Sequence, residues 1–231
     1  MPDSQQSFLK IALAFVFLAA LAIFFLNGGD RWLSLEFIQQ NRDRLLAYTD
    51  EHYLLMILGS TAVYVVSTAF SIPGGAVLSL TMGLLFGRVV GTLITVFAST
   101  AGGTLVFLAA RFIFADAARA RLAAHPAAER IISGFQRDAF RYLLFLRLVP
   151  LFPFWLVNLI PAFTRIDTRT YFLATLIGVI PGSFVYVNLG RALGEISSLK
   201  DLLSGDVILA LSLLGLLAVL PALVKEEVAE R

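Results

Sequence analysis

Three long stretches of this chain contain no charged residue, and they constrain its fold more than any other feature. They cover residues 89–110, 170–190 and 207–224, which are 22, 21 and 18 residues long. A helix needs about 20 apolar residues to cross the roughly 30 Å of hydrocarbon in a bilayer. Each stretch is therefore predicted to be a transmembrane helix.

The composition agrees with a membrane location. A soluble domain has about 25% charged and about 45–50% apolar residues, whereas this chain of 231 residues has 15% and 58%, with a mean hydropathy of +0.84. Residues 8–26 add another apolar stretch, and no small-residue cleavage site of a signal peptide follows it. We predict an all-α polytopic membrane protein in which residues 1–231 form a single membrane domain and 8–26 form its first transmembrane helix.

Two other apolar stretches are broken and do not suit a simple crossing. Residues 53–87 are uncharged, are interrupted by Pro73-Gly74-Gly75, and are too long for one crossing but too short for two. Residues 142–164 are apolar except for Arg147 and contain prolines, which break helices. We predict that each stretch is a re-entrant hairpin, which enters and leaves the membrane by the same face. Two kinked transmembrane helices are the alternative.

The two hairpins begin similar units along the chain. An offset of 80 residues aligns identical pairs in both units: Pro73 with Pro153, Val77 with Val157, Leu93 with Leu173, Thr95 with Thr175, Gly102 with Gly182 and Arg111 with Arg191. In each unit a proline-broken hairpin precedes a transmembrane helix with a glycine in its middle. Because one transmembrane helix separates the hairpins, they would open to opposite faces as an inverted repeat, an arrangement that places transporter sites at the midplane.

Basic residues indicate the orientation. Residues 111–141 contain the densest arginine cluster and are predicted to be a cytoplasmic loop. This assignment puts eleven Lys and Arg residues inside and six outside, whereas a complete crossing by residues 53–70 would give thirteen and four. The orientation of the N-terminal third therefore stays open. Residues 31–52 mix apolar and charged side chains, which fits either a helix lying in the membrane interface or a solvated linker.

Several kinds of chemistry find no support in the sequence. The chain has no cysteine, and its two histidines, His52 and His125, lie beside charged stretches. No Asp, Glu, His or Lys occurs between Tyr53 and Phe114, and no catalytic triad, carboxylate pair or phosphate loop occurs anywhere. We expect no enzymatic activity, no metal, no cofactor and no nucleic-acid partner.

Arg147 is the strongest candidate for a functional residue. It lies within an apolar stretch, where an arginine costs at least about 2.5–3.5 kcal/mol and is a functional candidate by default. Its guanidinium is permanently charged and suits a phosphate group. The alternative is a structural ion pair, for which Asp138 and Asp167 are the nearest acids. Arg141 is a weaker candidate near the same hairpin.

The glycines suggest two further features. Gly83, Gly87 and Gly91 follow each other at intervals of four, which favours close packing of helices. Pro73, Gly74 and Gly75 differ from these, because they would leave backbone amide donors at the start of the next half-helix. Such an N-terminus can bind an anion.

These segments resemble a known family over about residues 50 to 195. The first half is similar in Ile72-Pro73-Gly74-Gly75, in the Gly83 to Gly91 run and in Gly102-Gly103; the second half is similar in Phe145-Leu146-Arg147-Leu148-x-Pro150-x-x-Pro153-Phe154, in Asn158 and in Gly178-x-x-Pro181-Gly182. The family is the DedA/VTT-domain superfamily, in the branch labelled SNARE-associated Golgi proteins. The resemblance implies two opposed re-entrant hairpins, lipid scrambling or flipping, and, for bacterial members, the inner membrane. It also implies two functional arginines, which map onto Arg141 and Arg147. The acid that follows the first Pro-Gly in bacterial DedA proteins is replaced here by Gly75, which argues against proton coupling.

The sequence leads to a leading hypothesis and two alternatives. The leading hypothesis is a transporter of phospholipids or isoprenyl phosphate lipids, whose headgroup would pass between the hairpins. The site would consist of Arg147, Arg141, Pro73, Gly74, Gly75, Pro150, Pro153 and Asn158. The alternatives are an ion- or proton-linked transporter of a small solute and a non-transporting assembly protein of the membrane. We expect a multi-pass protein of a bacterial inner membrane, which could form a homo-oligomer.

Overall fold

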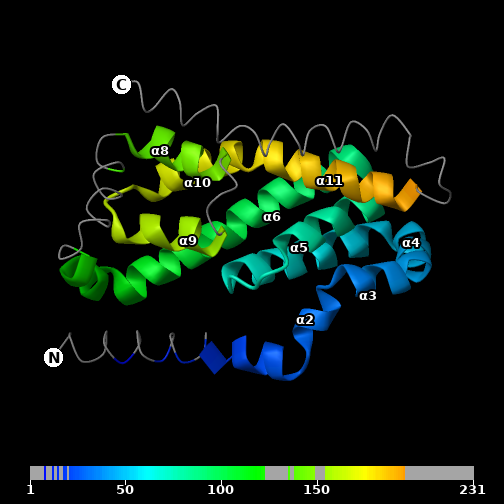
Figure 1. Cartoon of the computed structure of the whole chain (residues 1–231), viewed down its shortest axis with the longest axis horizontal. Helices are drawn as coiled ribbons and strands as arrows, with labels where there is room; N and C mark the ends of the chain where they lie inside the picture. The colour runs from blue at the N-terminus through cyan, green and yellow to red at the C-terminus, as the bar shows by residue number, and fades with distance from the viewer. Residues whose placement is uncertain are drawn as a thin grey trace.

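The protein is helical throughout the part of the chain that its computed structural model describes. That part comprises residues 8, 12, 15, 18, 19, 21–122, 135, 138–148 and 154–195. Its longest element, α6 (Gly75–Leu122), runs through the middle of the molecule, with α10 (Thr168–Gly178) and α11 (Ile180–Glu195) along one side and α5 (Tyr53–Ala69) along the other (Figure 1). The predicted all-α class is therefore confirmed for the described residues.

The first predicted hairpin is a helix, a tight turn and a second helix. Helix α5 ends where Ser71 adopts a left-handed backbone (φ 54°), with the amide of Ser71 bonded to the carbonyl of Thr68 and that of Ile72 to the carbonyl of Ser67. This pair of hydrogen bonds is the Schellman motif, which usually places glycine at the left-handed position. The chain then turns through Gly74, also at positive φ (142°), into α6.

Helix α6 reverses direction at Gly87, so its first part closes the hairpin. Gly87 has φ 73° and ψ −172°, a conformation that only glycine adopts readily. A Cβ on Gly91 would lie 2.5 Å from the carbonyl oxygen of Met82, although nine residues of straight helix would separate the two by about 13 Å. The rings of Tyr53 and Phe86 lie 5.8 Å apart, so the two ends of the hairpin are side by side. The geometry suits a re-entrant hairpin, and its insertion from one face of a membrane stays a prediction.

Cysteine labelling tests this topology, because the chain has no cysteine of its own. His52→Cys and Val89→Cys lie at the two ends of the hairpin, and both native side chains are exposed. We expect a membrane-impermeant maleimide to label both from the same side of sealed vesicles. Arg165→Cys should be labelled from the other side, since Arg111, 23 residues after Arg88, donates a hydrogen bond to the Thr164 carbonyl. Labelling of positions 52 and 89 from opposite sides would contradict the hairpin.

The second predicted hairpin is described on both sides of its tip. Helix α8 (Ala139–Leu148) forms one arm, and α9 (Phe154–Leu159) with the 3-10 helix η1 (Ile160–Phe163) forms the other. The tip between them, with Pro150 and Pro153, lies outside the described residues. Arg111 of α6 holds the end of this hairpin through hydrogen bonds to the carbonyls of Pro161, Ala162 and Thr164.

The helix that follows each hairpin packs against both hairpins. Within its own unit, Gly102 of α6 faces Thr68 of α5, and Gly178 of α10 faces Arg147 of α8. Toward the other unit, the second part of α6 packs against α9 and η1, while α11 packs against the start of α6. This reciprocal packing fits two related units, and their inverted symmetry stays a prediction.

Two predicted segments differ in detail from the structure. Helix α6 continues to Leu122, so the first part of the predicted loop 111–141 is helical, because its alanine-rich sequence favours helix and contains no glycine or proline. Residues 31–52 form parts of three short helices, α2 (Gly29–Trp32), α3 (Leu35–Gln40) and α4 (Arg42–Glu51). Ser34 divides the first two by accepting a hydrogen bond from the amide of Phe37 as an N-cap.

The structure agrees with the other predicted transmembrane helices to different extents. Residues 170–190 are helical but divided at Val179 into α10 and α11, with Pro181 in the first turn of α11, where proline is tolerated. In the segment 8–26, the residues that are described are helical. The segment 207–224 lies outside the described residues.

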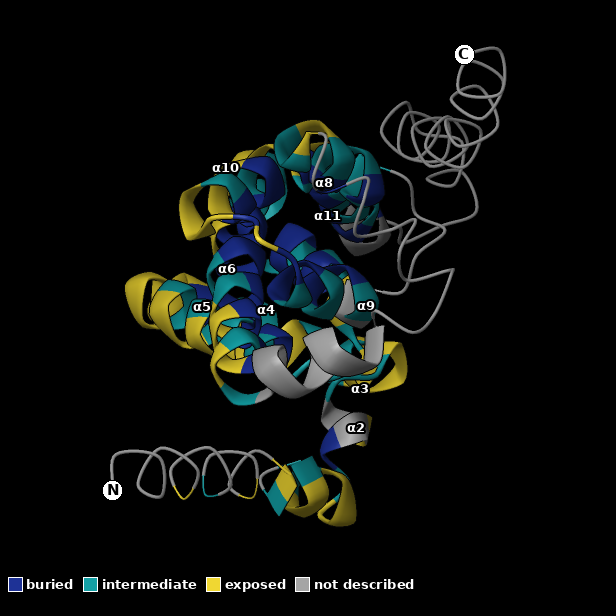
Figure 2. Cartoon of the chain, turned by 90° about the vertical axis from the view of Figure 1, so that its left-hand side faces the viewer, coloured by how far each residue is buried: buried dark blue, intermediate teal, exposed yellow. Residues whose placement is uncertain are grey.

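The surface of the described part suits a lipid environment. Two of its helical stretches are long and apolar enough to cross a membrane, Gly75–Ile113 and Thr168–Ala192. The first includes the reversal at Gly87, so the part after Gly87 would cross. Large apolar side chains are exposed along α5, α6 and α10, among them Leu54, Leu58, Val89, Phe97, Leu105 and Ile177, and Figure 2 shows exposed residues along the outer faces of α5 and α10. Such extensive apolar exposure is unusual for a soluble monomer and fits a membrane protein.

Candidate functional site

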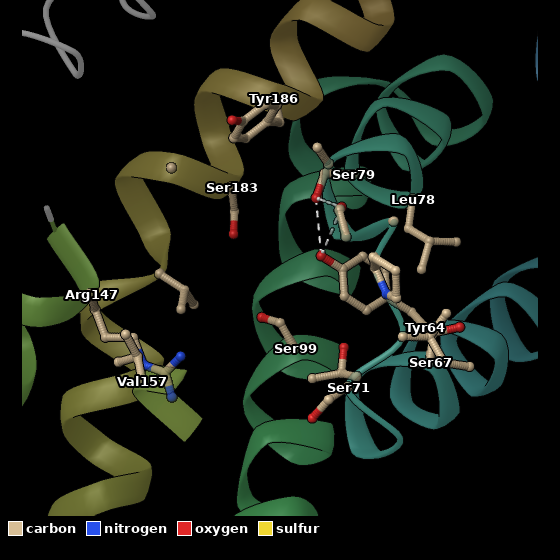
Figure 3. Close-up of a pocket in the computed structure, with 18 of the residues that line it drawn as sticks. Tyr64, Ser67, Ser71, Leu78, Ser79, Ser99, Arg147, Val157, Ser183 and Tyr186 are labelled. Carbon is tan, nitrogen blue, oxygen red and sulfur yellow. Dashed lines mark hydrogen bonds between the residues drawn. The ribbon is translucent and has the colours of Figure 1, made fainter. Parts of the chain in front are cut away.

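A cavity of about 590 Å³ lies between the two hairpins. Its wall combines the end of α5, the turn and the start of α6 with Ser99 farther along α6, the end of α8, Val157 of α9 and one face of α11 (Figure 3). Among the described lining residues Arg147 is the charged one, and eight carry hydroxyl groups: Tyr64, Ser67, Thr68, Ser71, Ser79, Ser99, Ser183 and Tyr186. The cavity therefore has one cationic side and one hydroxyl-rich side.

Arg147 is positioned by neutral hydrogen-bond acceptors. Its Nη2 donates to Asn158 Oδ1 at 2.7 Å, to the Tyr171 hydroxyl at 2.9 Å and to Thr175 Oγ1 at 3.2 Å. Gly178 leaves room for its stem, because a Cβ at that position would lie 2.6 Å from Arg147 Cβ. These contacts fix the guanidinium at the cavity wall.

Asp138 and Asp167, the two acids nearest to Arg147 in the sequence, have other contacts. Asp138 forms an ion pair with Arg141 at 3.3 Å. Asp167 caps α10 and accepts hydrogen bonds from the hydroxyl and the amide of Thr170, which hold the pKa of this carboxyl below its usual value. Neither carboxylate forms an ion pair with Arg147 in the described part of the chain.

The groups that hold Arg147 are themselves buried and fixed. Asn158 and Tyr171 are fully buried. The Tyr171 hydroxyl donates to the Gly103 carbonyl at 3.0 Å, and its ring stacks on Phe107 with 4.0 Å between centroids. Gly103 is required here, since a Cβ would come within 3.3 Å of both Asn158 Oδ1 and the Tyr171 hydroxyl. The middle of α6 therefore supports the position of Arg147 from behind.

On the opposite side, Tyr64 and Ser79 form a hydrogen-bonded chain. Ser79 Oγ donates to the Gly75 carbonyl at 2.7 Å, and the Tyr64 hydroxyl lies 3.0 Å from Ser79 Oγ (Figure 3). Because the Ser79 proton is used on the carbonyl, Tyr64 donates to Ser79. The Tyr64 oxygen then retains lone pairs that can accept a hydrogen bond.

The structure brings some of the predicted site residues together. Arg147, Pro73, Gly74 and Gly75 all line the cavity, although the two hairpins are about 70 residues apart in the chain. A Cβ on Gly75 would meet nothing within 4 Å, so this position faces open space. Whether the backbone amides there bind an anion stays a prediction.

The other predicted site residues lie elsewhere. Asn158 contacts Arg147 behind the cavity wall. Arg141 is exposed near the start of α8, six residues before Arg147, and is not among the lining residues. Pro150 and Pro153 lie outside the described residues.

Sequence reasoning missed most of the cavity wall. Tyr171 and Thr175, which hold Arg147, and the hydroxyl residues opposite to it were not predicted as site residues. A signal was present, because hydroxyl groups recur within otherwise apolar helices at intervals of four, as in Tyr64 with Thr68 and Tyr171 with Thr175. This spacing places two side chains on one face of a helix.

Comparison with known proteins identifies the family. The VTT domain matches residues 72–192, which include Arg147 and the part of the cavity wall from Ile72 onward. An uncharacterised membrane protein of Arabidopsis thaliana is 33% identical over 202 residues, covering 80% of this chain and 65% of that protein. The transmembrane protein 41 homologue of Dictyostelium discoideum is 32% identical over 189 residues, covering 80% and 56%.

Human transmembrane protein 41B is more distant, with 23% identity over 188 residues, 81% of this chain and 65% of that protein. The chain therefore spans less than two thirds of the length of these relatives. No solved structure matches it at a significant level. The resemblance noted in the sequence is confirmed: this chain is a membrane protein of the VTT-domain family, within the superfamily of DedA and the transmembrane protein 41 proteins.

Proposed function

We propose that this protein moves phosphate-bearing lipids between the two leaflets of a membrane. The headgroup would occupy the cavity between the hairpins, where Arg147 pairs with its phosphate, and the acyl chains would stay in the bilayer. The observation that carries the proposal is an arginine, held by Asn158 and Tyr171, on the wall of a cavity whose opposite side bears hydroxyl groups.

The size and chemistry of the cavity support this proposal. Ligand cavities of about 300–1,000 Å³ are usual for small molecules, and 590 Å³ accommodates a phosphate headgroup. A guanidinium forms two parallel hydrogen bonds to a phosphate, and it does so more strongly away from bulk water. The exposed apolar side chains on α5 and α6 would contact the acyl chains of the bilayer.

A transporter of a small soluble phosphate is the second candidate, because the same guanidinium would bind it. We favour a lipid because α5 of the first hairpin and α6 present large apolar side chains to the outside, so a headgroup could enter without its acyl chains leaving the bilayer. The cavity wall contains no His, Asp, Glu, Lys or Cys in the described residues that could activate one of its hydroxyl groups as a nucleophile. For location we propose a bacterial inner membrane from the resemblance to DedA proteins, whereas the relatives named above are eukaryotic.

Reconstitution tests the proposal directly. Purified protein is incorporated into liposomes that contain a fluorescent phospholipid or an isoprenyl phosphate, and the fraction accessible to a membrane-impermeant quencher is followed over time. We expect that fraction to rise from about half toward completion in protein-containing liposomes only. Entrapped glucose reports leakage as a control. Movement no faster than in empty liposomes would refute lipid transport.

We expect lipid movement without an imposed pH gradient. The cavity wall contains no carboxylate in the described part of the chain, and Gly75 occupies the position of the acid of bacterial DedA proteins. Gly75→Asp would add a carboxylate where a Cβ meets open space, and it should make transport respond to pH. The measurement compares initial rates at equal pH and across a gradient of one pH unit, for both proteins. Strict dependence of the native protein on the gradient would contradict this prediction.

A further inference from the structure

We infer that the cavity prefers a phosphate ester of a polyol, such as a glycerol- or inositol-type headgroup, over a headgroup that carries an ammonium group. This inference rests on the proposed function and names the class of substrate that the same cavity would accept. It follows from the distribution of charge and of hydroxyl groups on the cavity wall.

Charge disfavours an ammonium headgroup. The described cavity wall contains one cation, Arg147, and no carboxylate. An ammonium in the cavity would lose its water, find no carboxylate and share a small space with a guanidinium. Desolvating a charge without an opposite partner is costly, and a like charge nearby adds to that cost.

Hydroxyl groups favour a polyol. Eight hydroxyl side chains line the cavity, and a polyol presents several groups that both donate and accept hydrogen bonds. The Tyr64 oxygen is an acceptor, since its own proton points to Ser79, and it suits a donor hydroxyl of the headgroup. Arg147 lies across the cavity from Tyr64 and Ser79 (Figure 3). A phosphate at the arginine would therefore direct its polyol toward the hydroxyl side.

Ser71 gives independent support. It holds the left-handed position that ends α5, where glycine is less strained. Its Oγ is buried at the cavity and has no hydrogen-bond partner among the described residues. A buried hydroxyl without a partner destabilises the folded protein unless a ligand bonds to it. Serine instead of glycine at this position is therefore explained by a ligand that bonds to the hydroxyl.

The test measures selectivity within one sample. Liposomes contain phosphatidylglycerol and phosphatidylcholine with spectrally distinct labels on their acyl chains, and both transbilayer rates are recorded together. We expect phosphatidylglycerol to move about tenfold faster, which corresponds to one or two hydrogen bonds and the excluded ammonium. Equal rates would overturn the inference and leave the proposed function intact. Movement of neither lipid would refute both.

Ser71→Gly tests the role of the Ser71 hydroxyl, because it removes this hydroxyl and at the same time relieves the strain of the left-handed backbone. A loss of selectivity in this variant could not be attributed to a destabilised hairpin. We expect the phosphatidylglycerol to phosphatidylcholine ratio to fall about fivefold, as for one lost neutral hydrogen bond. Tyr64→Phe should lower the ratio similarly. Ser60→Ala is the matched control, since Ser60 bonds to its own helix at Ile57 and does not line the cavity. An unchanged ratio in both cavity variants would contradict the role of the hydroxyl side.

A second arm distinguishes a lipid from a soluble source of the same chemistry. The liposomes are loaded with radiolabelled glycerol 3-phosphate, and its efflux is measured beside lipid movement. Efflux slower than lipid movement, with no competition by external glycerol 3-phosphate, supports the lipid as the polyol phosphate. Rapid efflux without lipid movement would identify a soluble polyol phosphate as the substrate and overturn the lipid assignment.

Discussion

Arg147→Gln should abolish most transbilayer lipid movement while the protein remains folded. The substitution keeps a polar side chain but removes the charge that the proposal assigns to the phosphate. A hydrogen bond to a charged group contributes about 1.5–3 kcal/mol, so its loss predicts a rate at least tenfold lower, and about a hundredfold lower at the upper end. The measurement is the initial rate of lipid movement in liposomes with equal amounts of native and variant protein.

The folded state should tolerate this substitution because the hydrogen bonds that Arg147 donates to Asn158, Tyr171 and Thr175 go to neutral groups. The Tyr171 hydroxyl keeps its bond to the Gly103 carbonyl, and Gln can replace part of the lost network. We expect the free energy of unfolding to fall by less than about 2 kcal/mol. If Arg147 were half of a structural ion pair, its removal would cost about 3–5 kcal/mol, and the protein would fail to accumulate.

Two further variants complete the comparison. Arg147→Lys keeps the charge but cannot form the two parallel hydrogen bonds of a guanidinium, so intermediate activity is expected. Arg88→Gln is the matched control, because Arg88 Nε donates to Asn188 Oδ1 at 2.6 Å in much the same way, yet Arg88 does not line the cavity. Activity should survive in this control. A stable Arg147→Gln protein with undiminished lipid movement would refute the phosphate role and favour an assembly protein.

Gly83→Ala and Gly190→Ala should each destabilise the protein strongly. A methyl group on Gly83 would overlap the Val187 carbonyl oxygen of α11, and one on Gly190 would overlap the Leu80 carbonyl oxygen of α6. Both overlaps involve backbone, which cannot rotate away as a side chain can. Overpacking costs about 1–3 kcal/mol and occasionally more, and we expect these variants at or above the upper end. Thermal unfolding in detergent, followed by circular dichroism, measures the loss.

Gly59→Ala is the control for helix propensity. Gly59 lies in α5, and a methyl group added there would meet nothing within 4 Å, so alanine should stabilise the helix by up to about 1 kcal/mol. The contrast separates close packing from the general preference of helices for alanine. Native-like stability of both Gly83→Ala and Gly190→Ala would contradict the observed contact of α11 with the first hairpin.

The elements of the fold could be predicted because they depend on local patterns. Uncharged stretches of sufficient length indicated the helices, and Pro73-Gly74-Gly75 indicated a break between two of them. The residues at which the helices end were less predictable, since a charged residue alone does not end a helix. Arg111 was predicted to end the helix at the membrane surface, but it lies within α6 and bonds to the carbonyls of the other hairpin. The reversal at Gly87 also lacked a local signal that distinguishes it from Gly83 and Gly91.

The candidate site was predictable only in part, for a physical reason. By itself the sequence determined that an arginine lies in an apolar stretch, because a charge in hydrocarbon is costly wherever the chain folds. It also determined that no acid lies near it along the chain. Only the tertiary structure decided that Arg147 faces the first hairpin across a cavity, that Tyr171 and Thr175 hold it, and that hydroxyl groups lie opposite. These contacts join residues far apart in the chain, and hydroxyl groups are inexpensive in an apolar helix because they bond to its own carbonyls, so their positions leave little trace in the sequence pattern.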